Sequence, residues 1–164
     1  MKELLDKLSS YNIFNYLLPG ILFAVAVDEL TTLEILQKDI VVGVFVYYFF
    51  GTVVSRIGSL VVEPVLRKIG LITLTPYEDF VRAAKVDSKL EVISETNNMY
   101  RTFCALLLSV ATVVLYVYAS KYLPIMQTAA PLVCIAALFF LFVLSYKKQT
   151  AYISKRITTN LIDS

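Results

Sequence analysis

One arginine lies inside a long apolar stretch, and its charge is the first feature of this sequence that could do chemistry. Arg56 stands within residues 40–62, about 9 Å from their end at the helical rise of 1.5 Å per residue. Asn12, Asn15 and Glu63 are expected at a similar depth, and Glu63 shares the helical face of Arg56 at seven residues' distance. The four residues form a candidate intramembrane polar cluster. Two interpretations stay open: Arg56 reaches for lipid headgroups as an anchor, or it forms an ion pair or gate inside the bundle.

The remaining side chains do not form a catalytic pattern. The chain has no histidine, the commonest metal ligand and the usual acid–base group at neutral pH. Its two cysteines, Cys104 and Cys134, match no metal or redox spacing. There is no glycine-rich phosphate loop, no nucleophile motif and no carboxylate pair in the interior of an apolar stretch that could relay protons. We therefore expect that the protein is not an enzyme, and we expect no catalytic residue, cofactor or metal ligand.

The elements that must position the polar cluster are four apolar stretches. The apolar fraction is 58% and the mean hydropathy is +0.72, above the norm of about 45–50% apolar for soluble proteins. A bilayer core about 30 Å thick needs roughly 20 apolar residues. The stretches cover about residues 11–29, 40–62, 101–122 and 125–146. The sequence predicts an all-α integral membrane protein, with residues 1–164 forming a single domain of four transmembrane helices.

The basic residues predict the orientation of these helices. Twelve of the fifteen lie in the amino-terminal tail, in the connection between the second and third stretches counted up to Arg101, or in the carboxy-terminal tail. On the opposite side, Lys38 lies in the first connection and Lys121 at the end of the third stretch, and the remaining residue is Arg56. Because Lys and Arg are enriched in cytoplasmic loops, both termini, the segment 64–99 and the tail 147–164 are expected in the cytoplasm.

Small residues on the second stretch predict a helix-packing face. Gly51, Ser55 and Ser59 recur at every fourth position, a spacing that lets another helix approach closely. The contact can lie within the bundle or between subunits. In the first stretch, Pro19-Gly20 predicts a kink or local unwinding near Leu18.

The segment 64–99 is predicted to form a helical hairpin. Thr75-Pro76-Tyr77-Glu78 has the residues of a capping box, so a helix should follow to about Lys85. A second box at Ser88 predicts a helix that runs directly into the third stretch. The mixed charges of the segment argue against a nucleic-acid surface. In the tail, the spacing of Ile153, Ile157 and Leu161 predicts that the last helix continues into the cytoplasm, as an oligomer seam, a membrane-surface tail or a docking site.

The opening YNIFNYLLPGILF, the four-span layout and a charged hairpin that ends in NNMYRTF resemble the small membrane subunits encoded in bacterial antiphage defence operons, such as the membrane subunit of the Kiwa system. The resemblance covers the architecture of most of the chain. It implies a homo-oligomer of the bacterial inner membrane that senses envelope disturbance or perturbs the membrane with a cytoplasmic partner. The partner is expected to bind through 64–99 and 147–164. A small ion channel or transporter that acts alone is the alternative.

Overall fold

The computed structural model describes residues 13–123 and 125–162, and every regular element in these ranges is a helix. The described residues form six α-helices and two short π-helical turns, η1 and η2. In chain order the elements are η1 (Ile13–Leu17), α2 (Leu18–Leu30), α3 (Ile40–Ile57), η2 (Gly58–Val62), α4 (Glu63–Lys68), α5 (Tyr77–Val86), α6 (Lys89–Ser120) and α7 (Ile125–Ile162). The predicted all-α class is confirmed over these ranges.

Three helices are long and apolar enough to cross a membrane. They run over Ile40–Lys68, where α3, η2 and α4 are continuous, over Lys89–Ser120 and over Ile125–Leu161, with 29, 32 and 37 residues. At 1.5 Å per residue they are about 43, 48 and 56 Å long. Since the hydrocarbon core of a bilayer measures about 30 Å, each helix is longer than a single crossing requires. These helices are typical of an integral membrane protein.

The predicted first span, residues 11–29, does not reach this length in the structure. It overlaps η1 and α2, and α2 has 13 residues. Its first two residues, which include Asn12 of the predicted polar cluster, lie outside the described ranges. The described part of the chain therefore has three helices of spanning length where the sequence predicts four.

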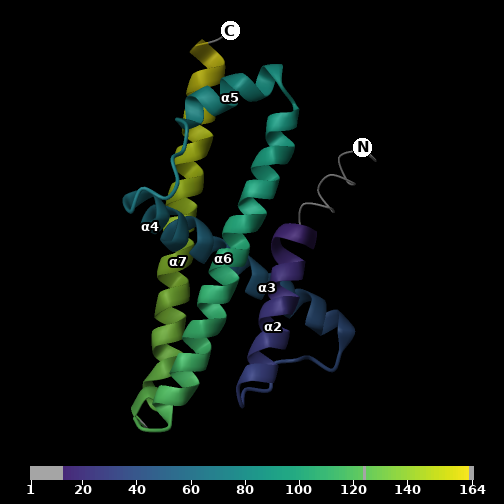
Figure 1. Cartoon of the computed structure of the whole chain (residues 1–164), viewed down its shortest axis with the longest axis vertical. Helices are drawn as coiled ribbons and strands as arrows, with labels where there is room; N and C mark the ends of the chain where they lie inside the picture. The colour runs from purple at the N-terminus through teal and green to yellow at the C-terminus, as the bar shows by residue number, and fades with distance from the viewer. Residues whose placement is uncertain (1–12, 124, 163–164) are drawn as a thin grey trace.

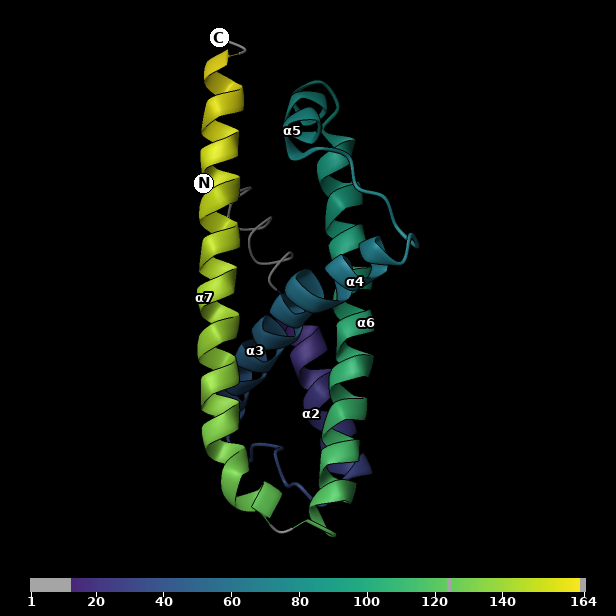
Figure 2. The same cartoon turned by 90° about the vertical axis from the view of Figure 1, so that its left-hand side faces the viewer.

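The long helices are arranged as an antiparallel pair with a third helix crossing between them. α6 and α7 run in opposite directions and are joined by a short connection after Ser120, as Figure 1 shows. The continuous helix α3–η2–α4 passes obliquely between them (Figure 2). α2 packs on α3 and α6. At the end away from the connection, α5 lies across the space between α6 and α7 (Figure 1).

Each π turn ends shortly before a proline. η1 ends at Leu17, before Pro19, and η2 ends at Val62, before Pro64. A proline has no N–H to donate and its ring crowds the preceding turn, and a wider π turn relieves both. The irregularity predicted near Leu18 is thus a change from π-helix to α-helix at that residue.

The core lies where α2, α3 and α6 meet. Val27, Val54 and Ala105 are almost fully buried there. Two glycines allow the backbones to approach: a Cβ atom on Gly20 would overlap the carbonyl oxygen of Tyr47, and one on Gly51 would overlap that of Tyr16. Close backbone contact of this kind is how membrane helices gain van der Waals packing where lipid already solvates apolar groups.

The helices predicted around the segment 64–99 are present. α5 begins at Tyr77 and ends at Val86, and α6 continues from Lys89 without a break into the third apolar stretch. The capping boxes do not form: Pro76, which has no hydrogen-bonding side chain, occupies the cap position of α5, and Ser88 at the cap of α6 makes no side-chain capping hydrogen bond.

α5 packs on α7 as well as on α6, so the structure does not confirm a hairpin formed by α5 and α6 alone. The rings of Tyr77 and Tyr152 lie 4.7 Å apart between centroids, and Lys155 pairs with Glu78 at 3.0 Å.

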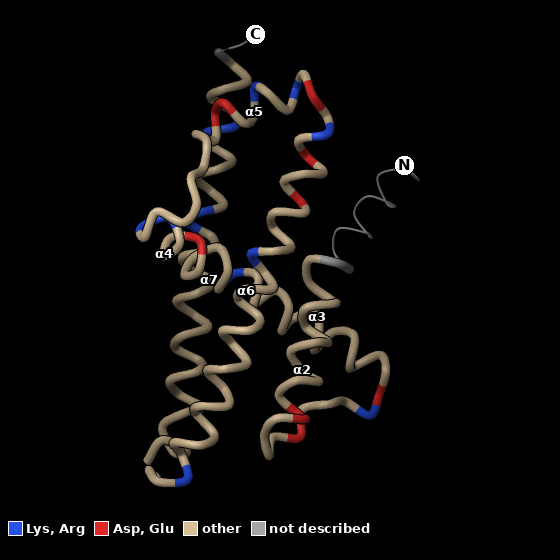
Figure 3. Tube along the Cα trace, viewed as in Figure 1, with Lys and Arg blue, Asp and Glu red and all other residues tan. Residues whose placement is uncertain are grey.

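Charged residues divide the molecule into two ends. Figure 3 shows Lys, Arg, Asp and Glu concentrated on α4, on α5 and on the adjacent parts of α6 and α7. We call α5 with residues 89–101 and 147–162 the charged end. Along the rest of α6 and α7, Lys121 in the connection is the charged residue (Figure 3). We call this connection, with the loop 31–39, the turn end.

Candidate functional site

Glu63 lies at the point where the three long helices meet, and it joins all three. It is the first residue of α4, and its side chain is 10% exposed. One carboxylate oxygen accepts a hydrogen bond from Nη1 of Arg101 on α6 at 2.5 Å, and the other accepts one from Nζ of Lys148 on α7 at 3.0 Å. Nζ of Lys148 also donates to the hydroxyl of Ser59 at 2.8 Å and to its carbonyl oxygen at 2.9 Å. We call Ser59, Glu63, Arg101 and Lys148 the Glu63 cluster.

The Glu63 cluster lies about one hydrocarbon thickness from the turn end. Arg101 precedes Ser120, the last residue of α6, by about 28 Å of helix, and Lys148 follows Ile125 by about 35 Å. Since the hydrocarbon core is about 30 Å thick, this depth corresponds to the edge of the core. The cations there neutralise a carboxylate that would otherwise be costly to bury, because an unpaired charge in a low-dielectric surrounding destabilises the folded state.

Arg56 does not pair with Glu63 in the structure. Its Nη2 donates to the hydroxyl of Tyr16 in η1 at 3.4 Å, and within the described residues its Nε, which is buried, makes no hydrogen bond. The sequence placed Arg56 and Glu63 on one face, a relation that assumes uninterrupted α-helix. The π turn Gly58–Val62 intervenes, and because a π turn takes more residues per turn, it moves Glu63 around the helix axis.

The structure distributes the other predicted polar residues as follows. Asn15 is buried in η1, next to the Tyr16 that receives the hydrogen bond from Arg56. Asn12 lies outside the described ranges. Glu63 pairs instead with Arg101 of α6 and Lys148 of α7. Arg56 therefore faces the first helix, and Glu63 faces the other two.

The predicted helix-packing face is buried, but its members touch different elements. Gly51 lies against the backbone of Tyr16, as described above. Ser55 is buried, and Ser59 is held by Lys148. Gly58, beside Ser59, lies on α6, where an added Cβ would come within 3.2 Å of the carbonyl oxygen of Arg101. Within one chain, Gly51 thus packs on η1 and Ser59 on a side chain of α7, while the neighbouring Gly58 packs on α6.

A polar cavity of about 590 Å³ opens beside the Glu63 cluster at the charged end. Its walls carry three cations, Arg56, Arg101 and Lys148, and the carboxylate of Glu63. Tyr77 and Phe80 of α5 and Tyr152 of α7 supply aromatic surface. The further lining residues are Ser59, Thr73, Leu74, Thr75, Leu90, Ile93, Ser94, Asn97, Asn98 and Gln149. We call this space the polar cavity.

A second cavity lies nearer the turn end and is apolar. It measures about 490 Å³, and Phe23, Phe50, Ile57, Leu108 and Leu141 are among its lining residues. On α7 the lining of this cavity covers residues 134–141 and that of the polar cavity covers 148–152. The two cavities are therefore offset along α7, with the apolar one nearer the turn end.

Arg101 and Lys148 are the functional candidates that sequence reasoning missed. A signal for Lys148 exists in the helical spacing of Leu138, Leu141, Ser145, Lys148 and Tyr152, which places these residues on one stripe of α7. Helical spacing predicts which residues share a stripe, and it contains no information on which helix the stripe faces.

Comparison of the chain with protein-family models, with curated proteins and with solved structures found no match. Among the described residues, no group of three or more Cys, Asp or Glu side chains is arranged to hold a metal ion. Fold and site together define an all-helical protein with three helices of membrane-spanning length and a buried, ion-paired joint between them.

Proposed function

We propose that this chain is an oligomeric membrane subunit that acts as a sensor, scaffold or membrane-perturbing effector with a cytoplasmic partner. The observation that carries the proposal is the continuity of α6 and α7. Each runs as one helix from the apolar part of the molecule, past the Glu63 cluster, to the charged end. A displacement of either helix within the bilayer would therefore move the surface that α5 and α7 offer to a partner.

In the proposed topology four segments cross the bilayer, and both termini are cytoplasmic with the charged end. The fourth crossing is the segment formed by η1 and α2. It covers Ile13–Leu30, and α2 packs on α3 and α6 over the apolar part of the molecule. The excess of Lys and Arg at the charged end supports the orientation, because cytoplasmic segments carry this excess.

The packing of α7 supports an oligomer. In its most apolar window 6% of the residues are buried, compared with 22% for the helix of α3 and 28% for α6. Phe139 and Phe140 are both exposed there. A helix with so few contacts in its own chain has most of its surface free, and a second copy would gain van der Waals packing there.

The resemblance to membrane subunits of antiphage defence operons extends the proposal to that setting, in the bacterial inner membrane. A channel formed by a single chain is disfavoured, because the cavity in the apolar part of the described structure is lined mainly by hydrophobic side chains. An ion crossing there would lose its hydration without replacement.

One experiment separates the leading proposal from the channel alternative. The purified chain, reconstituted in nanodiscs, would be weighed by native mass spectrometry and tested for conductance in planar bilayers. We expect more than one copy per disc and no conductance above that of protein-free bilayers. A single copy per disc together with ion conductance would overturn the proposal.

A further inference from the structure

The polar cavity holds more positive than negative charge, and its cations are incompletely used. Arg56, Arg101 and Lys148 face one carboxylate, that of Glu63. Glu63 takes one nitrogen from Arg101 and one from Lys148. The Nε atoms of Arg56 and Arg101 are buried and make no hydrogen bond within the described residues. A guanidinium carries five N–H donors, so each arginine retains donors for a further acceptor.

The rest of the lining suits a polar ligand of moderate size. The hydroxyls of Thr73 and Thr75 and the amides of Asn97 and Asn98 add neutral hydrogen-bonding groups. A volume of about 590 Å³ lies within the usual range of about 300–1,000 Å³ for small-molecule sites.

We propose that the polar cavity binds a phosphate-bearing anion, held by Arg56, Arg101 and Lys148. Arginine forks match the geometry of phosphate oxygens and bind them in pairs of charge-assisted hydrogen bonds, while lysine acts as a point charge. Glu63, which also lines the cavity, holds Arg101 and Lys148 in place through its two carboxylate oxygens. This inference rests on the proposed function and supplies the subunit with a ligand.

Two sources can deliver this chemistry. The cavity lies about one hydrocarbon thickness from the turn end, at the depth where the headgroup of an anionic lipid carries its phosphate. A soluble phosphate compound can reach the same place from the side of the charged end. In both cases the ligand meets Lys148, whose Nζ lies 5.8 Å from the ring centroid of Tyr152, and Tyr152 stacks on Tyr77 of α5. A ligand bound in the polar cavity would therefore change the contacts through which α5 docks on α7.

The test uses the full chain in nanodiscs. In the lipid arm, the chain is reconstituted in discs of phosphatidylcholine with one-fifth phosphatidylglycerol. Native mass spectrometry then releases the protein from the discs and identifies the lipid that stays bound to it. In the soluble arm, inorganic pyrophosphate is titrated calorimetrically into discs of phosphatidylcholine alone. We expect binding in one arm: retained phosphatidylglycerol identifies a lipid ligand, and heat from pyrophosphate identifies a soluble one. Absence of both overturns the proposal.

Arg56→Gln is the primary variant, because Arg56 makes no hydrogen bond or ion pair with the Glu63 cluster and its replacement removes none of those ion pairs. We expect the affinity in the responding arm to fall about tenfold, the effect of a lost charge-assisted contact. Lys148→Gln should lower it at least as much.

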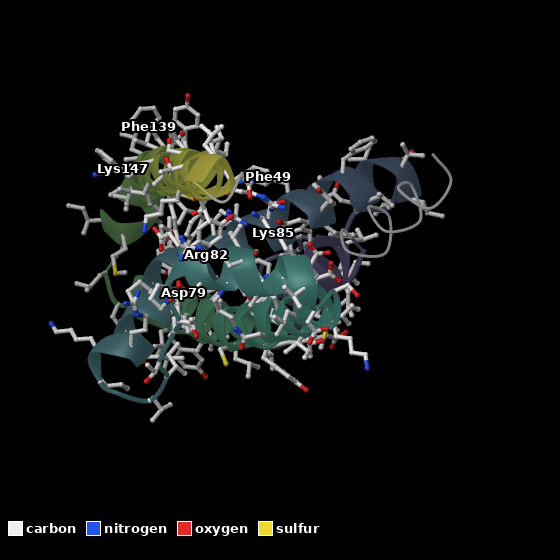
Figure 4. The ribbon with its side chains drawn as sticks, turned by 90° about the horizontal axis from the view of Figure 1, so that it is seen from above. Phe49, Asp79, Arg82, Lys85, Phe139 and Lys147 are labelled. Atoms are coloured by element: carbon white, nitrogen blue, oxygen red, sulfur yellow. The ribbon has the colours of Figure 1, made fainter. Side chains whose placement is uncertain are left out.

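Lys147→Gln is the matched control, since it removes the same charge one residue away. Figure 4 shows Lys147 on the outer side of α7, away from α5, and it should keep wild-type affinity. Equal losses for Lys147→Gln and Arg56→Gln would overturn the site. The same spectra report the number of copies per disc, so a missing ligand with an intact oligomer refutes this inference and leaves the proposed function standing.

Discussion

Glu63 and Lys148 lie 3.0 Å apart, between carboxylate oxygen and ammonium nitrogen, although 85 residues separate them in the chain. The contact joins the middle of the molecule to its last helix. It is possible because α3, η2 and α4 pass between α6 and α7, so that a residue on the crossing helix meets both neighbours (Figure 2). Arg101 approaches the same carboxylate from the opposite helix.

Replacing Glu63 with Gln should destabilise the fold. Arg101 and Lys148 would lose their common counter-charge in a mostly buried position, and breaking a buried pair costs about 3–5 kcal/mol. The apparent Tm in detergent, measured by loss of the monodisperse peak after heating, should fall by several degrees. Glu78→Gln, at a more exposed ion pair, is the control and should change the Tm little. Equal shifts for the two variants would contradict a structural role of the Glu63 cluster.

Replacing Gly51 with Ala should separate α3 from the first helix. The added Cβ would overlap the carbonyl oxygen of Tyr16, which is backbone and cannot turn aside, and overpacking of this kind costs about 1–3 kcal/mol. The apparent Tm of Gly51→Ala, measured in the same way, should be lower than that of the wild type.

Gly43→Ala is the control for the previous prediction. At Gly43 the nearest atom to an added Cβ belongs to the ring of Tyr47, at 3.2 Å, and a side chain can move. Alanine also gains up to about 1 kcal/mol of helix propensity over glycine. Gly43→Ala should therefore be neutral or stabilising. If it destabilises as much as Gly51→Ala, close backbone contact is not what makes Gly51 necessary.

Reporter fusions should place the charged end in the cytoplasm. Fusions after Lys85 and after Ser164 are expected to report cytoplasm, and fusions after Gln37 and Lys121 the opposite side, because Lys and Arg cluster at the charged end. A fusion at Lys85 that reports the outer side would reject this orientation. Fusions at Gln37 and Lys85 that report the same side would reject the crossing by α3, η2 and α4.

The docking of α5 on α7 should weaken in acid. Hydrogen bonds from its own backbone N–H and from Lys155 hold the pKa of Glu78 below its ordinary value of 4.5. A carboxylate with a lowered folded pKa stabilises the docked state above the unfolded value, and this contribution is lost as the pH falls through the lower folded value. Hydrogen exchange of the α5 amides, corrected for the intrinsic rate, should therefore lose protection when the pH drops from 7 to below 4.5.

Glu78→Gln tests whether this carboxylate is responsible. The variant should show reduced protection of α5 already at pH 7, with little further change in acid. An undiminished acid response in Glu78→Gln would assign the effect to another group.

The sequence by itself determined most of the helices of this protein, although the predicted first span does not reach spanning length in the described residues. Helix α7 follows from an apolar run that passes into the spacing of Ile153, Ile157 and Leu161, and α5 follows from Pro76 and the residues after it. These signals are local, because hydrophobic periodicity and proline act within one or two helical turns. The capping boxes predicted at Thr75 and Ser88 do not form, although the helices that they were expected to start are present.

The tertiary structure alone decided which charges meet. The partner of Glu63 depended on the path of the crossing helix, and the separation of Arg56 from Glu63 depended on the π turn at Gly58–Val62. The path of the crossing helix is fixed by backbone packing at Gly51 and Gly58 against other helices, a relation between residues far apart in the chain. Helical spacing could align Lys148 with Leu141 and Tyr152. It could not place that stripe opposite Glu63, because the direction in which a stripe faces is decided when the helices pack.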